Sequence, residues 1–212
     1  CRRTVRQRRY GRISSAIGRY PRHTAPMPKP AIEIHAVPHR ELTNEQLAQL
    51  RRLFDHEYLA DYGDWNPELP YGYAPHDLHL LANAGSTVVG HVGWAKRITT
   101  VGGQPVTVAG VGGVLVSPTV RGQQLGQRLM EAARVSMLDD PSIDYGYLGC
   151  DESVTSFYSS CGWQRISAPE RWINRDGNVV DSPAGHPLFI LPIHKTTDTW
   201  PTGRVDVNGR PW

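Results

Sequence analysis

Residues 111–126 read VGGVLVSPTVRGQQLG and continue a strand-like run that begins at Val106. Glycine inside a strand often marks a bulge, or a place where a ligand lies against the backbone. A basic, glycine-containing loop follows and leads into a helix at Leu125. The N–H groups at a helix start and the positive end of its dipole attract anions, and Arg121 adds positive charge. The stretch predicts a diphosphate-binding loop, although an ordinary loop before a well-started helix fits the same letters.

The rest of the chain alternates strand-like and helix-like patterns over a length suited to one core. Thr43 and Gln46 form a capping box ahead of a helix with one apolar face. Residues 60–77 are rich in Pro, Gly and aromatic residues, which favours an ordered loop. Strands are expected at 32–37, 78–82, 87–94, 106–116, 145–150, 172–173, 179–180 and 188–193, and helices after Thr43, from Leu125 and at 153–161. This order predicts a single α+β domain over residues 28–212.

Residues 1–27 form a separate, basic leader. They carry eight arginines and no acidic residue, whereas the rest of the chain carries 15 basic and 20 acidic residues. We expect the leader to be disordered or foreign to the native domain, because the first patterned segment follows Met27. A segment that binds nucleic acid or directs targeting is the alternative. The acidic remainder suits a cationic ligand.

Several classes of protein are excluded by what the sequence lacks. It contains no apolar run of about 18 residues and no signal-peptide core, so we expect no membrane association and a cytoplasmic location. Cys1, Cys150 and Cys161 lack the spacing of a disulfide framework or a zinc site. The histidines are scattered without the i,i+4 pairing of a helical metal site, which favours surface or hydrogen-bonded core histidines. We therefore expect no metal.

Two blocks of the sequence resemble signatures of the GNAT superfamily of N-acetyltransferases. Residues 111–126 are similar to its acetyl-CoA pattern, Arg/Gln-x-x-Gly-x-Gly/Ala, except that Gln124 stands where the first glycine is usual. Phe157-Tyr158-x-x-Cys161-Gly162-Trp163 is similar to its segment in which a tyrosine faces the CoA sulfur. The resemblance implies an α/β/α sandwich with a mixed, mostly antiparallel twisted sheet flanked by helices. It also implies acetyl-CoA as cosubstrate.

Two groups of acyltransferases share further features with the chain. The loop at Arg121, the Tyr158 block and the tail that ends in Trp212 resemble aminoglycoside 2′-N-acetyltransferases, with a kasugamycin-type branch included. Trp200-Pro201-x-Gly203 and Asp206-x-Asn208-Gly209 resemble instead the tail of nodulation protein A, which places a fatty chain on an amino sugar. Both resemblances imply N-acylation of an aminoglycoside or another cationic amino sugar. A GNAT domain that binds CoA without catalysis is a third hypothesis.

The GNAT resemblance also assigns residues to the cosubstrate and to catalysis. Tyr158 would protonate the departing thiolate. Gly112 stands where the 2′-acetyltransferases carry a glutamate base, so we assign the base to Asp151 or Glu152, which would equally serve to cap the helix after them. The pantetheine arm would contact the backbone of Val114, Leu115 and Val116, and the diphosphate would contact Arg121, Gly122, Gln123, Gln124, Leu125 and Gly126.

Substrate residues follow from the same resemblance. Asp64 and Asp181 match substrate carboxylates of the 2′-acetyltransferases, and carboxylates suit a polycationic sugar. Trp212 would supply a stacking ring and a terminal carboxylate. The glycines near the strand ends complete the assigned substrate site: Gly112, Gly113 and Gly149. Superfamily members often form homodimers, but the sequence contains no interface signature, and nucleic acid is not the expected partner.

Overall fold

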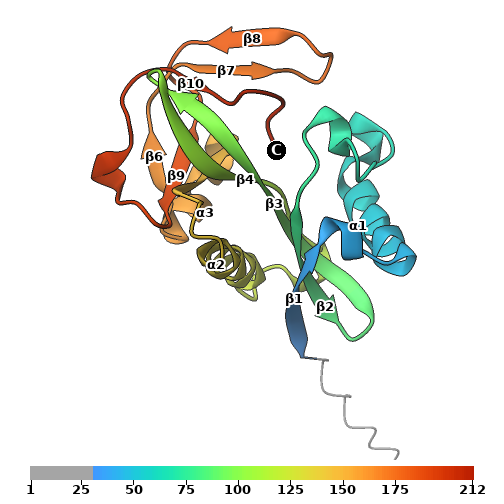
Figure 1. The fold of residues 1–212 in the computed structure, drawn as a ribbon. Coiled ribbons are helices and arrows are strands. Elements are labelled where there is room, and N and C mark those ends of the chain that lie inside the picture. Colours follow the sequence, from blue (N-terminus) through green and yellow to red (C-terminus); the bar gives the residue numbers. More distant parts are fainter. Residues whose placement is uncertain (1–30) are drawn as a thin grey trace, which may run out of the picture.

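The structure, a computed structural model, describes residues 31–212 (Figure 1). The leader predicted for residues 1–27 lies outside the described residues. A mixed sheet is flanked by helices, in the element order β1 (Ile32–Pro38), α1 (Asn44–Tyr62), β2 (Leu78–Ala84), β3 (Thr87–Val101), β4 (Gln104–Val116), α2 (Leu125–Leu138), β5 (Tyr145–Gly149), α3 (Thr155–Ser160), β6 (Gln164–Ile166), β7 (Glu170–Ile173), β8 (Val179–Ser182), β9 (Leu188–Pro192) and β10 (Val205–Asp206).

The long antiparallel pair of β3 and β4 organises the sheet. β2 and β1 extend it from the first part of β3. β5 pairs parallel with β4, and β9 and β6 follow in antiparallel order. The end of β3 pairs with β10, which pairs parallel with β7, and β8 forms that edge. The mixed, mostly antiparallel sheet predicted from the GNAT resemblance is confirmed.

Helices α1 and α2 pack on opposite faces of this sheet. Successive side chains of a strand point to opposite faces. Leu80 of β2 accordingly packs in the cluster that contains α2, while its neighbour Leu81 packs in the cluster that contains α1. α1 begins at the predicted capping box, in which Thr43 and Gln46 each accept a hydrogen bond from the other's backbone amide.

β4 carries a bulge in the middle of the sheet. Between Gly112 and Leu115, two residues of β4, Gly113 and Val114, face a single residue of β3. Gly113 has a φ of 58°, a left-handed conformation that glycine adopts at low cost. The pairing of β4 with β5 ends before the bulge, at Gly110. The bulge expected from the glycine run is confirmed, and around it the β4 backbone lies outside the regular ladder.

The C-terminal segment lies across the sheet instead of forming a free tail. Arg97 of β3 donates hydrogen bonds to the carbonyls of Val207 and Arg210 and lies 4.2 Å from the centre of the Trp212 ring. The backbone amide of Ala74 donates to the Pro211 carbonyl. These contacts fix Trp212 against the sheet, close to the bulge.

The differences from the predicted elements are confined to short or irregular segments. β6 and β10 have three and two residues, which is too short for a periodic pattern. β3 runs on to Val101, past the end predicted at Trp94. No strand is predicted after residue 193, but the residues from His194 onward contain β10, which pairs with the end of β3.

Gly110→Ala is expected to dislodge the C-terminal segment. A Cβ atom at Gly110 would lie 2.0 Å from the Trp212 ring. Overpacking of this kind costs about 1–3 kcal/mol, so urea unfolding should reveal a loss of that size. In a Trp212→Ala background the same change should cost less than about 0.5 kcal/mol, because the ring is gone. Equal losses in both backgrounds would contradict this packing.

Candidate active site

A cavity of about 440 Å³, here called the loop cavity, opens where β4 leaves the ladder and α2 begins. Gln123 is exposed and is not among its lining residues. The other residues predicted for the cosubstrate all line it, together with residues of α3: Val114, Leu115, Val116, Arg121, Gly122, Gln124, Leu125, Gly126, Phe157 and Tyr158. The structure thus brings the predicted strand, loop and helix start to one opening.

The start of α2 is accessible to an anion from this cavity. No side chain caps its first amides. Gln124, which precedes the helix, has a φ of 58° and a ψ of 16°. Such a conformation costs a residue with a side chain about 1–3 kcal/mol, which is why glycine suits this position of the superfamily pattern. Gln124 therefore adopts the backbone conformation that glycine would adopt at this position, and it does so at a cost in conformational strain.

Arg121 stands at the rim of the loop cavity in an ion pair. Its guanidinium lies 2.9 Å from the Glu57 carboxylate of α1, and its Nε donates to the Val116 carbonyl. The hydrogen bond from Arg121 lowers the pKa of Glu57. The arginine remains half exposed, so an incoming diphosphate would compete with Glu57 for it.

Tyr158 is buried in the wall of the loop cavity. Burial raises the pKa of its hydroxyl, and the nearby Cys150 thiol raises it further. The hydroxyl therefore stays protonated at neutral pH. Since a thiol has a pKa of about 8.5, full proton transfer from Tyr158 to a thiolate would be uphill. Its position suits hydrogen bonding to the leaving group better than complete protonation.

A second cavity, of about 390 Å³ and here called the carboxylate cavity, opens beside the end of β5. Two of the residues predicted for the substrate, Gly149 and Trp212, line it. The remaining lining residues come from β4, β5, β7 and the loops around them: Tyr73, Val111, Tyr147, Leu148, Cys150, Asp151, Glu170, Trp172, His186 and Pro211.

The two carboxylates predicted as general base differ in their surroundings. Asp151 lines the carboxylate cavity, but it accepts a hydrogen bond of 2.8 Å from the Ser153 amide, which lowers its pKa. Glu152 forms a bidentate ion pair with Arg165, with hydrogen bonds of 2.7 and 2.9 Å. Glu152 does not line the carboxylate cavity. Asp151 thus caps the helix that follows it, as the alternative interpretation predicted. The lowered pKa of Asp151 makes it a weak base.

Glu170 of β7, which the sequence did not single out, is buried in the same cavity. Its Oε1 accepts a hydrogen bond of 2.6 Å from the Tyr147 hydroxyl. Burial raises the pKa of Glu170, partly offset by that hydrogen bond. A carboxylate with a raised pKa is a better base near neutral pH than an exposed one. In the sequence, the feature that could have indicated Glu170 is its spacing of two residues from Trp172. This spacing places both side chains on one face of a short strand.

A third cavity, of about 220 Å³ and here called the aromatic cavity, adjoins the other two. It shares Val114 with the loop cavity, and Tyr73 and Trp212 with the carboxylate cavity. Its other lining residues come mainly from α1, the loop after it and β4: Phe54, Tyr58, Tyr62, Pro70, Tyr71, His76 and Gly113. The three cavities therefore meet around the β4 bulge.

Three residues predicted for the substrate have other positions. Asp64 lines a separate, polar cavity with Arg175 and Asp176. Asp181 on β8 is paired with Arg204 at 3.3 Å. Gly112 is covered, because a Cβ atom there would lie 2.3 Å from the Trp212 backbone. The structure brings Gly113, Gly149 and Trp212 together around the bulge, while Asp64 and Asp181 line none of the three cavities.

Solved structures similar to this chain include two that are named as GNAT family acetyltransferases. Escherichia coli ElaA has 20% identity and a TM-score of 0.53, with 76% of this chain and 98% of that chain covered. Escherichia coli YhbS in complex with CoA has 17% identity and a TM-score of 0.53, with coverages of 87% and 93%. A Brucella melitensis GNAT acetyltransferase in complex with acetyl-CoA has 16% identity and a TM-score of 0.52, with coverages of 82% and 94%.

The chain has the GNAT fold, and this fold together with the family match makes it an acyltransferase. The sequence pattern of nodulation protein A (NodA) matches residues 32–211, and the chain belongs to that family. A comparison with curated proteins found no match. Among residues 31–212, no helix combines the length and the apolar character needed to cross a membrane.

Arg121→Ala is expected to weaken CoA binding about tenfold, because it removes a charged partner of the diphosphate worth about 1.5 kcal/mol or more. The loss should shrink as salt is added. Arg134→Ala is the matched control, since Arg134 forms a similar exposed pair with Glu131 on the same helix and lies outside the loop cavity. Calorimetric titration with CoA measures both variants. Equal affinities for the two would contradict a role for Arg121.

Proposed function

We propose that this protein transfers an acyl chain longer than acetyl from a thioester donor to the amine of an amino sugar. The observation that carries the proposal is the aromatic cavity, which opens at the β4 bulge next to the loop cavity. Membership of the nodulation protein A family, whose resemblance implies fatty-acyl transfer to an amino sugar, supports the same conclusion.

The donor is proposed to lie along β4 with its diphosphate at the start of α2. Its pantetheine arm follows Val114–Val116, where one edge of the strand faces the loop cavity. The thioester carbonyl lies at the bulge, because Gly113 and Val114 face one residue of β3 and their amides are out of register with it. Amides aimed at a developing oxyanion stabilise the transition state. The acyl chain continues into the aromatic cavity.

The acceptor amine is proposed to enter through the carboxylate cavity. Glu170 takes a proton from the attacking amine as the nitrogen–carbon bond forms. The carbon–sulfur bond then breaks, and the thiolate leaves toward Tyr158, which donates a hydrogen bond to it. The Tyr147 hydroxyl holds the Glu170 carboxylate in place at 2.6 Å. Every group in this sequence of steps lines one of the three cavities.

Acetyl transfer from acetyl-CoA to an aminoglycoside is the second candidate function. It is favoured by the two carboxylates of the carboxylate cavity, Asp151 and Glu170, which suit a cationic sugar. The aromatic lining favours the longer acyl group, because each buried CH₂ contributes about 0.8 kcal/mol and an acetyl group contains none. The length of the acyl chain that the enzyme prefers separates the two candidates.

Tyr58→Ala is expected to reduce the preference for long acyl chains. Wild-type kcat/KM with a glucosamine oligosaccharide should be at least about tenfold higher for palmitoyl-CoA than for acetyl-CoA, a difference of about 1.4 kcal/mol. Tyr58→Ala should lower the palmitoyl value severalfold and leave the acetyl value unchanged. Leu59→Ala, on the exposed side of the same helix, is the control. A wild-type preference for acetyl-CoA would favour the aminoglycoside candidate instead.

Glu170→Gln is expected to lower kcat/KM about 100-fold or more, the usual contribution of a general base. Because burial raises the pKa of Glu170, wild-type activity should fall on acidification at a pH above the ordinary glutamate range, and the variant should lose that acid limb. Glu131→Gln, an exposed glutamate paired with Arg134 on α2, serves as control. Should Asp151→Asn remove activity while Glu170→Gln retains it, the base is Asp151.

A further inference from the structure

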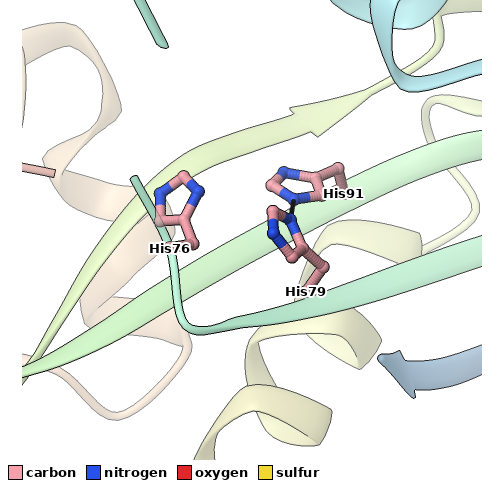
Figure 2. A group of neighbouring side chains, drawn as sticks. All are labelled: His76, His79 and His91. Carbon is pink, nitrogen blue, oxygen red and sulfur yellow. Dashed lines mark hydrogen bonds between the residues drawn. The ribbon is translucent and has the colours of Figure 1, made fainter. Parts of the chain in front are cut away.

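Four histidines that are scattered in the sequence converge between α1 and the sheet. His79 of β2 and His91 of β3 are buried, and their Nδ1 and Nε2 atoms lie 2.9 Å apart, as the dashed line in Figure 2 shows. His76, in the loop before β2, is buried beside them. His39 contacts His79 from the outer side at 3.0 Å and contacts the Glu68 carboxylate at 3.0 Å.

The outer nitrogens of this cluster have partners suited to metal ligands. His91 Nδ1 lies 2.7 Å from the Gly113 carbonyl, which can only accept, so that nitrogen carries the proton and Nε2 presents a lone pair. His79 can likewise direct a protonated Nε2 toward His39, which passes a hydrogen bond on to Glu68. Its Nδ1 then presents a second lone pair. The Gly113 carbonyl behind His91, and the Glu68 carboxylate that reaches His79 through His39, are the kinds of group that form the outer shell of a metal site.

The lone pairs of His79 Nδ1 and His91 Nε2 point toward each other. Packing of side chains in an apolar core does not by itself call for this arrangement. With both outer nitrogens protonated as above, His79 Nδ1 and His91 Nε2 would be two acceptors 2.9 Å apart. In the alternative with a proton between them, His79 Nε2 accepts from His39, and either His39 or Glu68 must then carry an additional proton to make their hydrogen bond. A cation between the two rings removes this need and leaves every hydrogen bond satisfied.

His76 supplies the independent observation. Its Nε2 is buried and has no hydrogen-bond partner among residues 31–212. An imidazole whose ring nitrogen has no hydrogen-bond partner can offer that nitrogen to a metal ion as a ligand. A Cβ atom at Gly93 would lie 2.3 Å from the His76 ring, so the glycine makes room for it. One ligand atom from each of His76, His79 and His91 lies within 4.8 Å of the others.

We propose that His76, His79 and His91 bind one divalent transition-metal ion, zinc in the first instance. Three neutral imidazoles with a nitrogen–metal distance of about 2.0–2.1 Å are a common zinc ligand set, and tetrahedral geometry places such nitrogens roughly 3.3 Å apart. The rings need small movements to reach that spacing. Imidazole ligands exclude calcium and magnesium, which prefer oxygen. This proposal departs from the prediction, made from the sequence, that the protein binds no metal.

The ion would join the sheet to the loop that lines the aromatic cavity. His79 and His91 belong to paired strands, whereas His76 belongs to the loop and lines that cavity. Through His91 the ion would also hold the Gly113 carbonyl at the bulge. Three protein ligands leave a fourth position, as in zinc sites that bind water or substrate. The ion would thus stabilise the bulge and would keep one coordination position open for a further ligand.

The test uses the purified full chain without a histidine tag, stripped by a chelator and then titrated with Co²⁺ and Zn²⁺ in the absence of any acyl donor. We expect one equivalent of Co²⁺ to bind with the visible absorption of a low-coordinate nitrogen site, and Zn²⁺ to displace it. The melting temperature should rise with metal concentration. His76→Phe keeps a ring over Gly93 and should weaken binding more than about 100-fold, beyond the effect of an outer-shell change.

A matched pair of exposed glutamates keeps the test valid if the His76 variant fails to fold. Glu68 and Glu33 are both 74% exposed and each contacts a histidine Nε2, but only Glu68 leads to the cluster. Glu68→Gln should weaken metal binding about tenfold, and Glu33→Gln should not change it. The proposal is overturned if the wild type binds no stoichiometric Co²⁺, or if Glu68→Gln and Glu33→Gln bind it equally well.

Discussion

The bulge at Gly113 is the constraint around which the site is arranged. It interrupts the β3–β4 ladder after the β4–β5 pairing has already ended, so the β4 backbone faces cavities on both sides of the sheet. The hydrogen bond from His91 to the Gly113 carbonyl fixes one side of the bulge at 2.7 Å. Because the carbonyl is held there, the neighbouring amides keep a fixed direction, which is what stabilisation of an oxyanion requires.

The glycines around the bulge leave space beside the sheet. Residues from distant parts of the chain occupy this space. Trp212 covers Gly110 and Gly112, and His76 covers Gly93. A glutamate at position 112 would collide with Trp212, so the base that the 2′-acetyltransferases carry there has no room in this fold. Glu170 of β7 instead places a carboxylate in the carboxylate cavity, which Trp212 also lines. The position of Trp212 thus explains why a glycine, and no larger residue, fits at position 112.

Features governed by neighbouring residues could be predicted from sequence, whereas contacts between distant segments could not. The Thr43 capping box and the glycine bulge depend on local backbone preferences, and both are confirmed. Most of the wall of the loop cavity also comes from one continuous segment, Val114 to Gln127, and only the α3 side comes from elsewhere in the chain. Glu170 and the histidine cluster depend on which strands become neighbours, and no periodicity in one segment reports that. The prediction for Asp64 rests on a resemblance within a loop, and such a resemblance does not report the path that the loop takes.

The tail residues that resemble nodulation protein A have mainly structural contacts. Trp200 stacks on Tyr147, the residue that holds Glu170, and Asn208 donates a hydrogen bond to the Ile98 carbonyl of β3. Gly203 lies where its Cβ atom would be 2.7 Å from Gly102. These contacts deliver Trp212 to the wall shared by the aromatic and carboxylate cavities. The tail residues that resemble nodulation protein A therefore hold the C-terminal segment in the position that closes these two cavities.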